Sequence, residues 1–178
     1  MTHKVMKSEI IFMRRTAKIA GNTRCWIGIG CVIAKSGKIL VEAWNETLPG
    51  EEFCQEFRKH KIEKGPALRC KAGPYHNNEG CIRHKLKLSG GKDAEKVCSI
   101  HAEVNAIAKA ARQGIKIDGA TMFTTSFPCL ICIRAIIAAG IKKVIYMNDF
   151  YQPHHLKLFS ENEIDIQQIP ETEVWENK

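Results

Sequence analysis

Two short clusters of metal-binding side chains carry the chemistry that the sequence can offer. His101 and Glu103 form the first cluster, and Cys129 and Cys132 form the second. One histidine and two cysteines suit a catalytic zinc, which takes three protein ligands and keeps a fourth position open for water. A nearby carboxylate that does not bind the metal, here Glu103, can then move protons. These four residues predict a catalytic zinc site.

The spacing within each cluster indicates how the side chains could converge. Pro128 suits the start of a helix, so Cys129 and Cys132 would lie three residues apart on one face of its first turn. The positive end of that helix also favours thiolates. Cys-x-x-Cys alone would also fit half of a structural zinc site, and a histidine followed by a glutamate is common at helix starts. The combination of both clusters, with a strand between them, favours the catalytic interpretation.

Hydrophobic periodicity predicts the elements that must position these residues. The predicted helices are 8–20, 101–112, 129–139 and 156–162, and the predicted strands are 27–34, 38–44, 120–125, 143–147 and 164–169. Ser8 is the predicted N-cap of the first helix. Gly37 suits the tight turn of an antiparallel hairpin made by the first two strands. The alternation of strands and helices predicts a sheet with helices packed on its faces.

Composition limits the class of protein to which such a site could belong. Of the 178 residues, 44% are hydrophobic and 26% are charged, as expected for a single domain over residues 1–178. Neither a secretory signal nor a membrane span is evident, which favours a cytoplasmic enzyme without a membrane partner. The net charge of +8 favours an anionic partner, either nucleic acid or a phosphorylated small molecule, or reflects only a solvated basic surface.

A Cys/His-rich insertion at about residues 46–97 interrupts the regular pattern. A stretch of this length without periodicity needs something to hold it in place. Its cysteines and histidines, including one cysteine at its edge, are Cys54, Cys70, Cys81, Cys98, His60, His76 and His84. In a reducing compartment such cysteines are more often metal ligands or buried thiols than disulfides. We therefore expect a second metal site.

The order of these motifs resembles that of a known family. H-x-E followed by P-C-x-x-C is a recognised signature of zinc nucleobase deaminases. Residues 125–129 resemble the T-x-F-P-C motif, and residues 139–144 the A-G-I-K-K-V motif, of the deoxycytidylate (dCMP) deaminase family in the cytidine deaminase superfamily. The similarity runs over nearly the whole chain. It implies an α/β fold, specifically a three-layer α/β/α sandwich with a mixed central sheet of about five strands, and a homo-oligomer, often a hexamer.

The resemblance also implies substrate-binding residues. Asn45 matches the asparagine expected to bind the sugar hydroxyl. Tyr151 matches a tyrosine of the nucleotide pocket, although it would equally suit a half-buried place in the core. Glu46 stands where the family commonly has glycine, which puts a carboxylate near the position expected for an anionic substrate.

Many members of the family also hold a structural zinc. The cysteines at the corresponding places in this chain are Cys25, Cys54, Cys81 and Cys98. His84 is a rival fourth ligand, and Cys70 with His76 could replace either or join a third site. The resemblance therefore implies Zn²⁺ as the cofactor, with one catalytic and one structural ion.

The expected reaction is hydrolytic deamination of dCMP to dUMP and ammonia, a step of pyrimidine deoxynucleotide metabolism that supplies dTTP precursors. Zinc would lower the pKa of its bound water and give hydroxide near neutral pH. Glu103 would carry the proton to N3 of the base and then to the leaving amine.

Three alternatives remain open from the sequence. The substrate could be another cytosine nucleoside or nucleotide. The chain could act on tRNA or single-stranded nucleic acid and use its basic insertion to track phosphates, but it lacks the E-P-C-x-M-C motif of the tRNA adenosine deaminases. It could also be a zinc-stabilised, non-catalytic binding protein, against which the presence of Glu103 argues because a structural zinc has no use for a non-ligating carboxylate.

Overall fold

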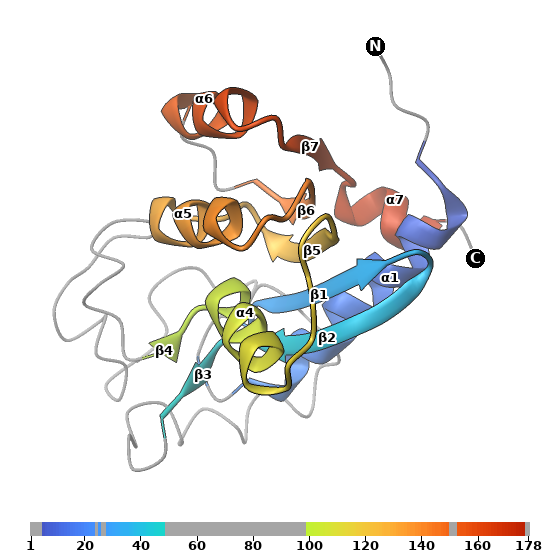
Figure 1. Ribbon diagram of the computed structural model, residues 1–178. Coiled ribbons are helices and arrows are strands. Elements are labelled where there is room, and N and C mark those ends of the chain that lie inside the picture. Colours follow the sequence, from blue (N-terminus) through green and yellow to red (C-terminus); the bar gives the residue numbers. More distant parts are fainter. Residues whose placement is uncertain (1–4, 24, 26–27, 49–98, 150–152, 177–178) are drawn as a thin grey trace, which may run out of the picture.

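A five-stranded mixed sheet forms the centre of the molecule. The computed structural model describes residues 5–23, 25, 28–48, 99–149 and 153–176 (Figure 1). The strands of the sheet are β1 (Gly30–Lys35), β2 (Lys38–Trp44), β5 (Thr121–Ser126), β6 (Lys143–Asn148) and β7 (Asp165–Gln168). Their order is β2-β1-β5-β6-β7, in which β1 is antiparallel to β2 and β5, and β5, β6 and β7 are parallel. The predicted mixed sheet of about five strands is confirmed.

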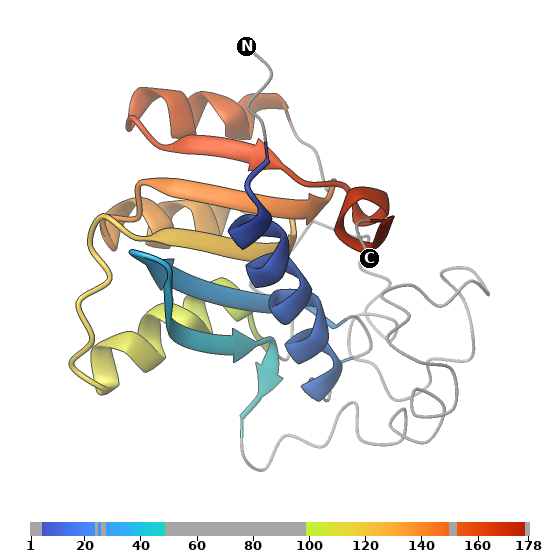
Figure 2. The same cartoon turned by 90° about the vertical axis from the view of Figure 1, so that its right-hand side faces the viewer.

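Helices cover both faces of this sheet, as the two views together show (Figures 1 and 2). Helix α1 (Lys7–Ile19), which continues into a short 3₁₀ turn (Ala20–Asn22), lies on one face with α7 (Glu171–Glu176). The helices on the other face are α4 (Ala102–Arg112), α5 (Leu130–Ala138) and α6 (Pro153–Glu161). The predicted α/β/α sandwich is therefore confirmed. The short helix α7 was not predicted.

Side chains that alternate along the strands contribute to two separate hydrophobic cores, one on each face of the sheet. Cys31 and Ile33 of β1 belong to the core beneath α4, α5 and α6, whereas Val32 and Ala34 belong to the core beneath α1. Successive side chains of a strand point to opposite faces, so a strand covered on both faces reads as a continuous apolar run. This explains why β1 shows no polar alternation in the sequence.

The predicted hairpin of β1 and β2 is confirmed. Its two turn residues, Ser36 and Gly37, have φ values of 51° and 75°. Two central residues in the left-handed region match the twist of the flanking strands, and a glycine adopts this conformation without steric cost.

Helix α1 begins differently from the prediction. Its N-cap is Met6, so the prediction of Ser8 as the N-cap is wrong. The carboxylate of Glu9 accepts a hydrogen bond from the Met6 N–H at 2.9 Å, and it also lies 3.0 Å from Nζ of Lys143 on β6. The buried Glu9 accepts a hydrogen bond from a backbone N–H that has no partner within the helix, and it also pairs with a lysine. These two contacts fix the start of the helix at Met6, one turn before Glu9.

The two ends of the insertion are joined by a small sheet that was not predicted. Strand β3 (Glu46–Thr47) pairs antiparallel with β4 (Ser99–Ile100). β4 leads directly into α4, so this pairing fixes the approach of the chain to His101. Among the residues that the structure describes, no helix is long and apolar enough to cross a membrane.

Gly30 allows close packing of α1 on the sheet, and we expect Gly30→Ala to destabilise the fold. A Cβ atom on Gly30 would overlap the backbone oxygen of Thr16 in α1, which cannot move alone. Such overpacking costs about 1–3 kcal/mol of the free energy of unfolding, measurable by denaturant titration. Gly21→Ala is the matched control, because a Cβ at Gly21 meets open space and the change should stay within about 0.5 kcal/mol. Equal stability of the two variants would contradict the close approach.

Candidate active site

His101 and Glu103 are placed by the start of α4. His101 is the N-cap residue of this helix, and its carbonyl accepts the first helical hydrogen bond from the Asn105 N–H at 2.8 Å. Glu103 lies in the first turn and is 4% exposed. A second contact holds α4 to the edge of the sheet, since Nδ2 of Asn105 donates to the Trp44 carbonyl at 2.8 Å.

Cys129 and Cys132 are placed by the start of α5. Cys129 is the N-cap residue, and the Ile133 N–H donates to its carbonyl at 2.9 Å. The loop that leads from β5 to Cys129 is anchored by Phe127, which packs edge-on against Tyr146 and Phe159 and donates its N–H to the Asn148 carbonyl. The prediction of a helix start at this pair is confirmed.

The structure brings the three predicted metal ligands together. Nδ1 of His101 lies 3.4 Å from Sγ of Cys129 and 3.3 Å from Sγ of Cys132, and the two sulfurs are 3.6 Å apart. Tetrahedral zinc with bonds of about 2.0 Å to nitrogen and about 2.3 Å to sulfur would separate these atoms by roughly 3.5 Å for N–S and roughly 3.8 Å for S–S. The donor atoms therefore have the spacing and chemistry that one zinc ion requires.

The carboxylate of Glu103 borders this triangle of donors without belonging to it. Its Oε2 lies 3.4 Å from Sγ of Cys132, and its Oε1 lies 3.5 Å from Oγ1 of Thr124. The three atoms grouped as a metal site come from His101, Cys129 and Cys132. Burial raises the pKa of the Glu103 carboxyl, because a charged group loses its hydration there. The group is placed to exchange a proton with a molecule at the metal.

The two thiols differ in acidity. The contact between the two sulfurs, 3.6 Å apart, lowers the pKa of the Cys129 thiol to about 4 despite its partial burial, and the neighbouring His101 adds to the effect. The same contact and the burial of Cys132 raise its own pKa. Metal binding requires thiolates, and the contacts of Cys129 favour this form.

Two residues beneath Glu103 were missed by the sequence interpretation. Thr124 of β5 and Cys31 of β1 are opposite each other in the antiparallel ladder, and both are 0% exposed. Burial, and then the negative charge of Glu103, raise the pKa of the Cys31 thiol. The one signal available in the sequence was a threonine within the predicted strand 120–125. The pairing of β1 with β5 that brings both residues under α4 could not be derived from the sequence.

The remaining predicted site residues are described only in part. Asn45 is 7% exposed, and its Oδ1 accepts a hydrogen bond from the Ile29 N–H at 2.8 Å. Cys25 is 8% exposed, and its N–H donates to Oγ1 of Thr23 at 3.0 Å. The predicted residues that lie outside the described part of the chain are Cys54, His60, Cys70, His76, Cys81, His84, Cys98 and Tyr151.

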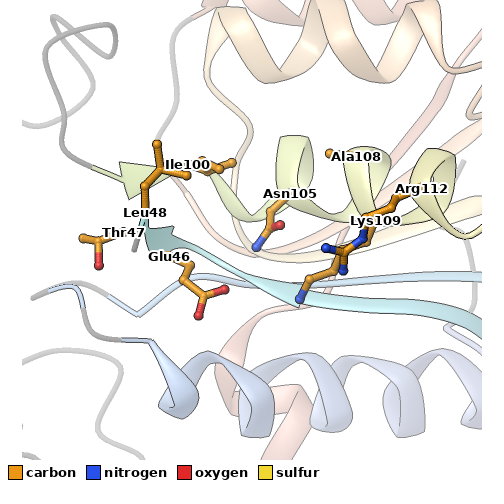
Figure 3. Close-up of a pocket in the computed structure, with 8 residues that line it drawn as sticks. All are labelled: Glu46, Thr47, Leu48, Ile100, Asn105, Ala108, Lys109 and Arg112. Carbon is orange, nitrogen blue, oxygen red and sulfur yellow. The ribbon is translucent and has the colours of Figure 1, made fainter. Parts of the chain in front are cut away.

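A groove of about 390 Å³ lies between α4 and the small sheet (Figure 3). Its lining residues are Glu46, Thr47, Leu48, Ile100, Asn105, Ala108, Lys109 and Arg112. Nζ of Lys109 also lies 4.5 Å from the centre of the Trp44 ring, which lets the cation rest on an aromatic face. The three metal donors and Glu103 are not among the lining residues. Glu46, the residue expected near an anionic substrate, lies in the lining of this groove.

Solved structures define the class of the fold. A dCMP deaminase from the cyanophage S-TIM5, determined in complex with dCMP and dUMP, matches with a TM-score of 0.62 at 22% sequence identity, over 94% of this chain and 100% of that chain. At 22% sequence identity, this match indicates the fold and not the function. The fold is thus cytidine deaminase-like, with a His/Cys/Cys group where both helices begin.

Sequence comparison then defines the family. Residues 6–148 match the model of the cytidine and deoxycytidylate deaminase zinc-binding region. The deoxycytidylate deaminase of Enterobacteria phage T2 is 31% identical over 165 residues, covering 86% of each protein, and that of Enterobacteria phage T4 is 30% identical over 169 residues with the same coverage. The chain belongs to the cytidine and deoxycytidylate deaminase family and is a zinc-binding hydrolytic deaminase. The resemblance drawn from the motifs is confirmed.

Proposed function

We propose that the chain deaminates dCMP hydrolytically to dUMP and ammonia, in pyrimidine deoxynucleotide metabolism. The observation that carries the proposal is the Glu103 carboxylate, 3.4 Å from Sγ of Cys132 and beside three donors spaced for one zinc. The names of the two phage relatives, and the dCMP and dUMP bound to the cyanophage enzyme, support this substrate. A purely structural zinc would not need a buried carboxylate at that position.

Each residue of the site receives one role. His101, Cys129 and Cys132 would hold zinc, which would supply the activation of a water molecule for attack on C4 of the cytosine ring. Glu103 would accept one proton from the attacking water and deliver it to N3. It would then take the remaining hydroxyl proton of the C4 adduct and pass it to the amine, so that ammonia leaves and the C4 carbonyl forms. Burial of Glu103 keeps bulk water from competing for that proton.

The proposal extends to residues beyond the metal triangle. Asn45 and Tyr151 would bind the nucleotide. A second, structural zinc would be held by Cys25, Cys54, Cys81 and Cys98, with His84 and Cys70 as rivals. Burial of Cys25 and the pairing of β3 with β4 support a fixed base for the insertion within one domain over residues 1–178. A homo-oligomer and a cytoplasmic location remain predictions from the sequence.

Substrate choice tests the proposal most directly. We expect kcat/KM for dCMP to exceed that for deoxycytidine by roughly a hundredfold, because two charge-assisted hydrogen bonds to the phosphate would supply about 3 kcal/mol. Binding energy from the phosphate can be used at the reacting base, so deoxycytidine should show a lower kcat than dCMP as well as weaker binding. The measurement is ammonia release from both compounds by the zinc-loaded protein.

A wider panel separates the alternatives. CMP and dCTP test the sugar and the phosphate count, and tRNA and single-stranded DNA test nucleic acid as the substrate. Equal rates on dCMP and deoxycytidine, or deamination of a nucleic acid faster than of any free nucleotide, would contradict the proposal.

A further inference from the structure

A fully buried threonine hydroxyl lies against the Glu103 carboxylate. Oγ1 of Thr124 in β5 donates a hydrogen bond to Oε1 of Glu103 over 3.5 Å. The other carboxylate oxygen, Oε2, lies on the side of Cys132, at 3.4 Å from its sulfur. The two oxygens of Glu103 thus have different neighbours, one on the sheet and one on the metal side.

The surroundings of Thr124 are otherwise unsuited to a hydroxyl. Thr124 is 0% exposed, and Met122, two residues earlier on the same face of β5, belongs to the apolar core beneath α4. Burial of a hydroxyl in such a place costs free energy unless it finds a hydrogen-bond acceptor. Valine would fill the same volume without that cost. The contact with Glu103 is therefore the feature that gives a threonine an advantage at this position.

We propose that Thr124 is a positioning residue for the deamination reaction. Its hydroxyl holds Oε1 of Glu103, so that Oε2 stays directed at the metal donors and accepts the proton of the attacking water. The Thr124 proton remains on its own oxygen, and only Glu103 gains and releases a proton. This inference rests on the proposed role of Glu103.

The geometry explains why such a contact would affect the rate. A glutamate side chain has three torsion angles, and rotation about the last one exchanges its two oxygens. A donor fixed on a rigid strand beneath one oxygen reduces this freedom, which keeps the carboxylate near its reactive orientation. Hydrogen bonds of general acid-base groups are often long without substrate and shorten in the complex, so 3.5 Å is a reasonable starting distance.

The neighbouring residue provides a matched control. Thr125 is 1% exposed, but its side chain points to the opposite face of β5, where Oγ1 accepts a hydrogen bond from the Gly30 N–H at 3.1 Å. Thr124→Val and Thr125→Val each remove one buried hydroxyl from the same strand. Only the first removes a contact with Glu103.

The experiment measures kcat, KM for dCMP, zinc content and thermal midpoint of Thr124→Val, Thr124→Ser and Thr125→Val. For Thr124→Val we expect kcat to fall about three- to tenfold, which corresponds to the loss of one ordinary hydrogen bond, in keeping with the length of this contact. KM and zinc content should stay at the wild-type values, and Thr124→Ser should restore kcat. Thr125→Val should lower the thermal midpoint and leave kcat of the folded protein unchanged.

Two further measurements separate positioning from general damage. In the Glu103→Ala background, Thr124→Val should cause no further loss of rate, because residues that act as a unit are not additive. The carboxylate stretching band of Glu103, obtained as the infrared difference between wild type and Glu103→Ala, should shift in Thr124→Val and not in Thr125→Val.

Several results would overturn the inference. These are an unchanged kcat in Thr124→Val, an equal loss of rate in the Glu103→Ala background, loss of zinc, or failure of serine to restore the rate. If Glu103→Ala itself keeps full turnover, the proposed role of Glu103 fails and this inference fails with it. If Glu103→Ala is inactive while Thr124→Val is fully active, only the role of Thr124 is wrong.

Discussion

Glu103→Ala should lose turnover by a factor of about 10²–10⁴, the range for removal of a positioned general acid-base group. It should nevertheless keep its zinc. The three donor atoms of His101, Cys129 and Cys132 complete a triangle with sides of 3.3 to 3.6 Å, and no atom of Glu103 is needed to close it. Steady-state kinetics with dCMP, beside elemental analysis for zinc, measure both quantities on one preparation.

Two companion variants make that result specific. Glu103→Gln keeps the shape of the side chain and should be nearly as slow as Glu103→Ala, because an amide cannot accept and return the proton. Glu161→Ala removes an exposed glutamate at the end of α6 that pairs with the exposed Lys157, and it should keep its rate and its zinc. A loss of zinc in proportion to the loss of activity would identify Glu103 as a ligand, and its assignment as the proton carrier would be wrong.

Local signals in the sequence predicted the parts of the site that depend on local structure. The helix starts at His101 and Cys129 were found because each metal-binding residue stands directly before a run with helical periodicity. The β1–β2 hairpin was found because apolar runs flank a glycine. These elements agree with the structure to within one residue at each end, except that the first strand begins at Gly30, three residues after its predicted start.

Long-range pairing explains what the sequence did not predict. β3 and β4 have two residues each and join segments on either side of the insertion, so no periodicity marks them. Thr124 and Cys31 meet beneath Glu103 only because β1 pairs with β5 in one particular register. The N-cap of α1 was missed because a methionine has no side-chain oxygen that could cap a helix. Instead, the carboxylate of Glu9, three residues later, accepts a hydrogen bond from the Met6 N–H.

Wild-type protein should carry two zinc ions per chain, and the two sites should fail in different ways. Structural zinc in small peptide sites contributes an apparent ~10–16 kcal/mol at neutral pH, comparable to the ~5–15 kcal/mol that stabilises a typical domain. Cys54→Ser should therefore leave one zinc and give a protein that melts early or is poorly soluble. Cys132→Ser should also leave about one zinc and should lose nearly all turnover, while it damages folding less, because α5 and the sheet retain their apolar core.

Elemental analysis of the wild type, Cys54→Ser, Cys132→Ser and a control cysteine variant decides the count. Cys31→Ala is the control, because Cys31 is buried in the sheet outside the donor triangle and its loss should lower stability without lowering zinc content. The thermal midpoint of each variant separates the structural site from the catalytic one. One zinc per chain in the wild type, unchanged by Cys54→Ser and lost in Cys132→Ser, would leave the catalytic site intact as proposed. The cysteines of the insertion would then be ordinary thiols, and another interaction would have to hold the insertion in place.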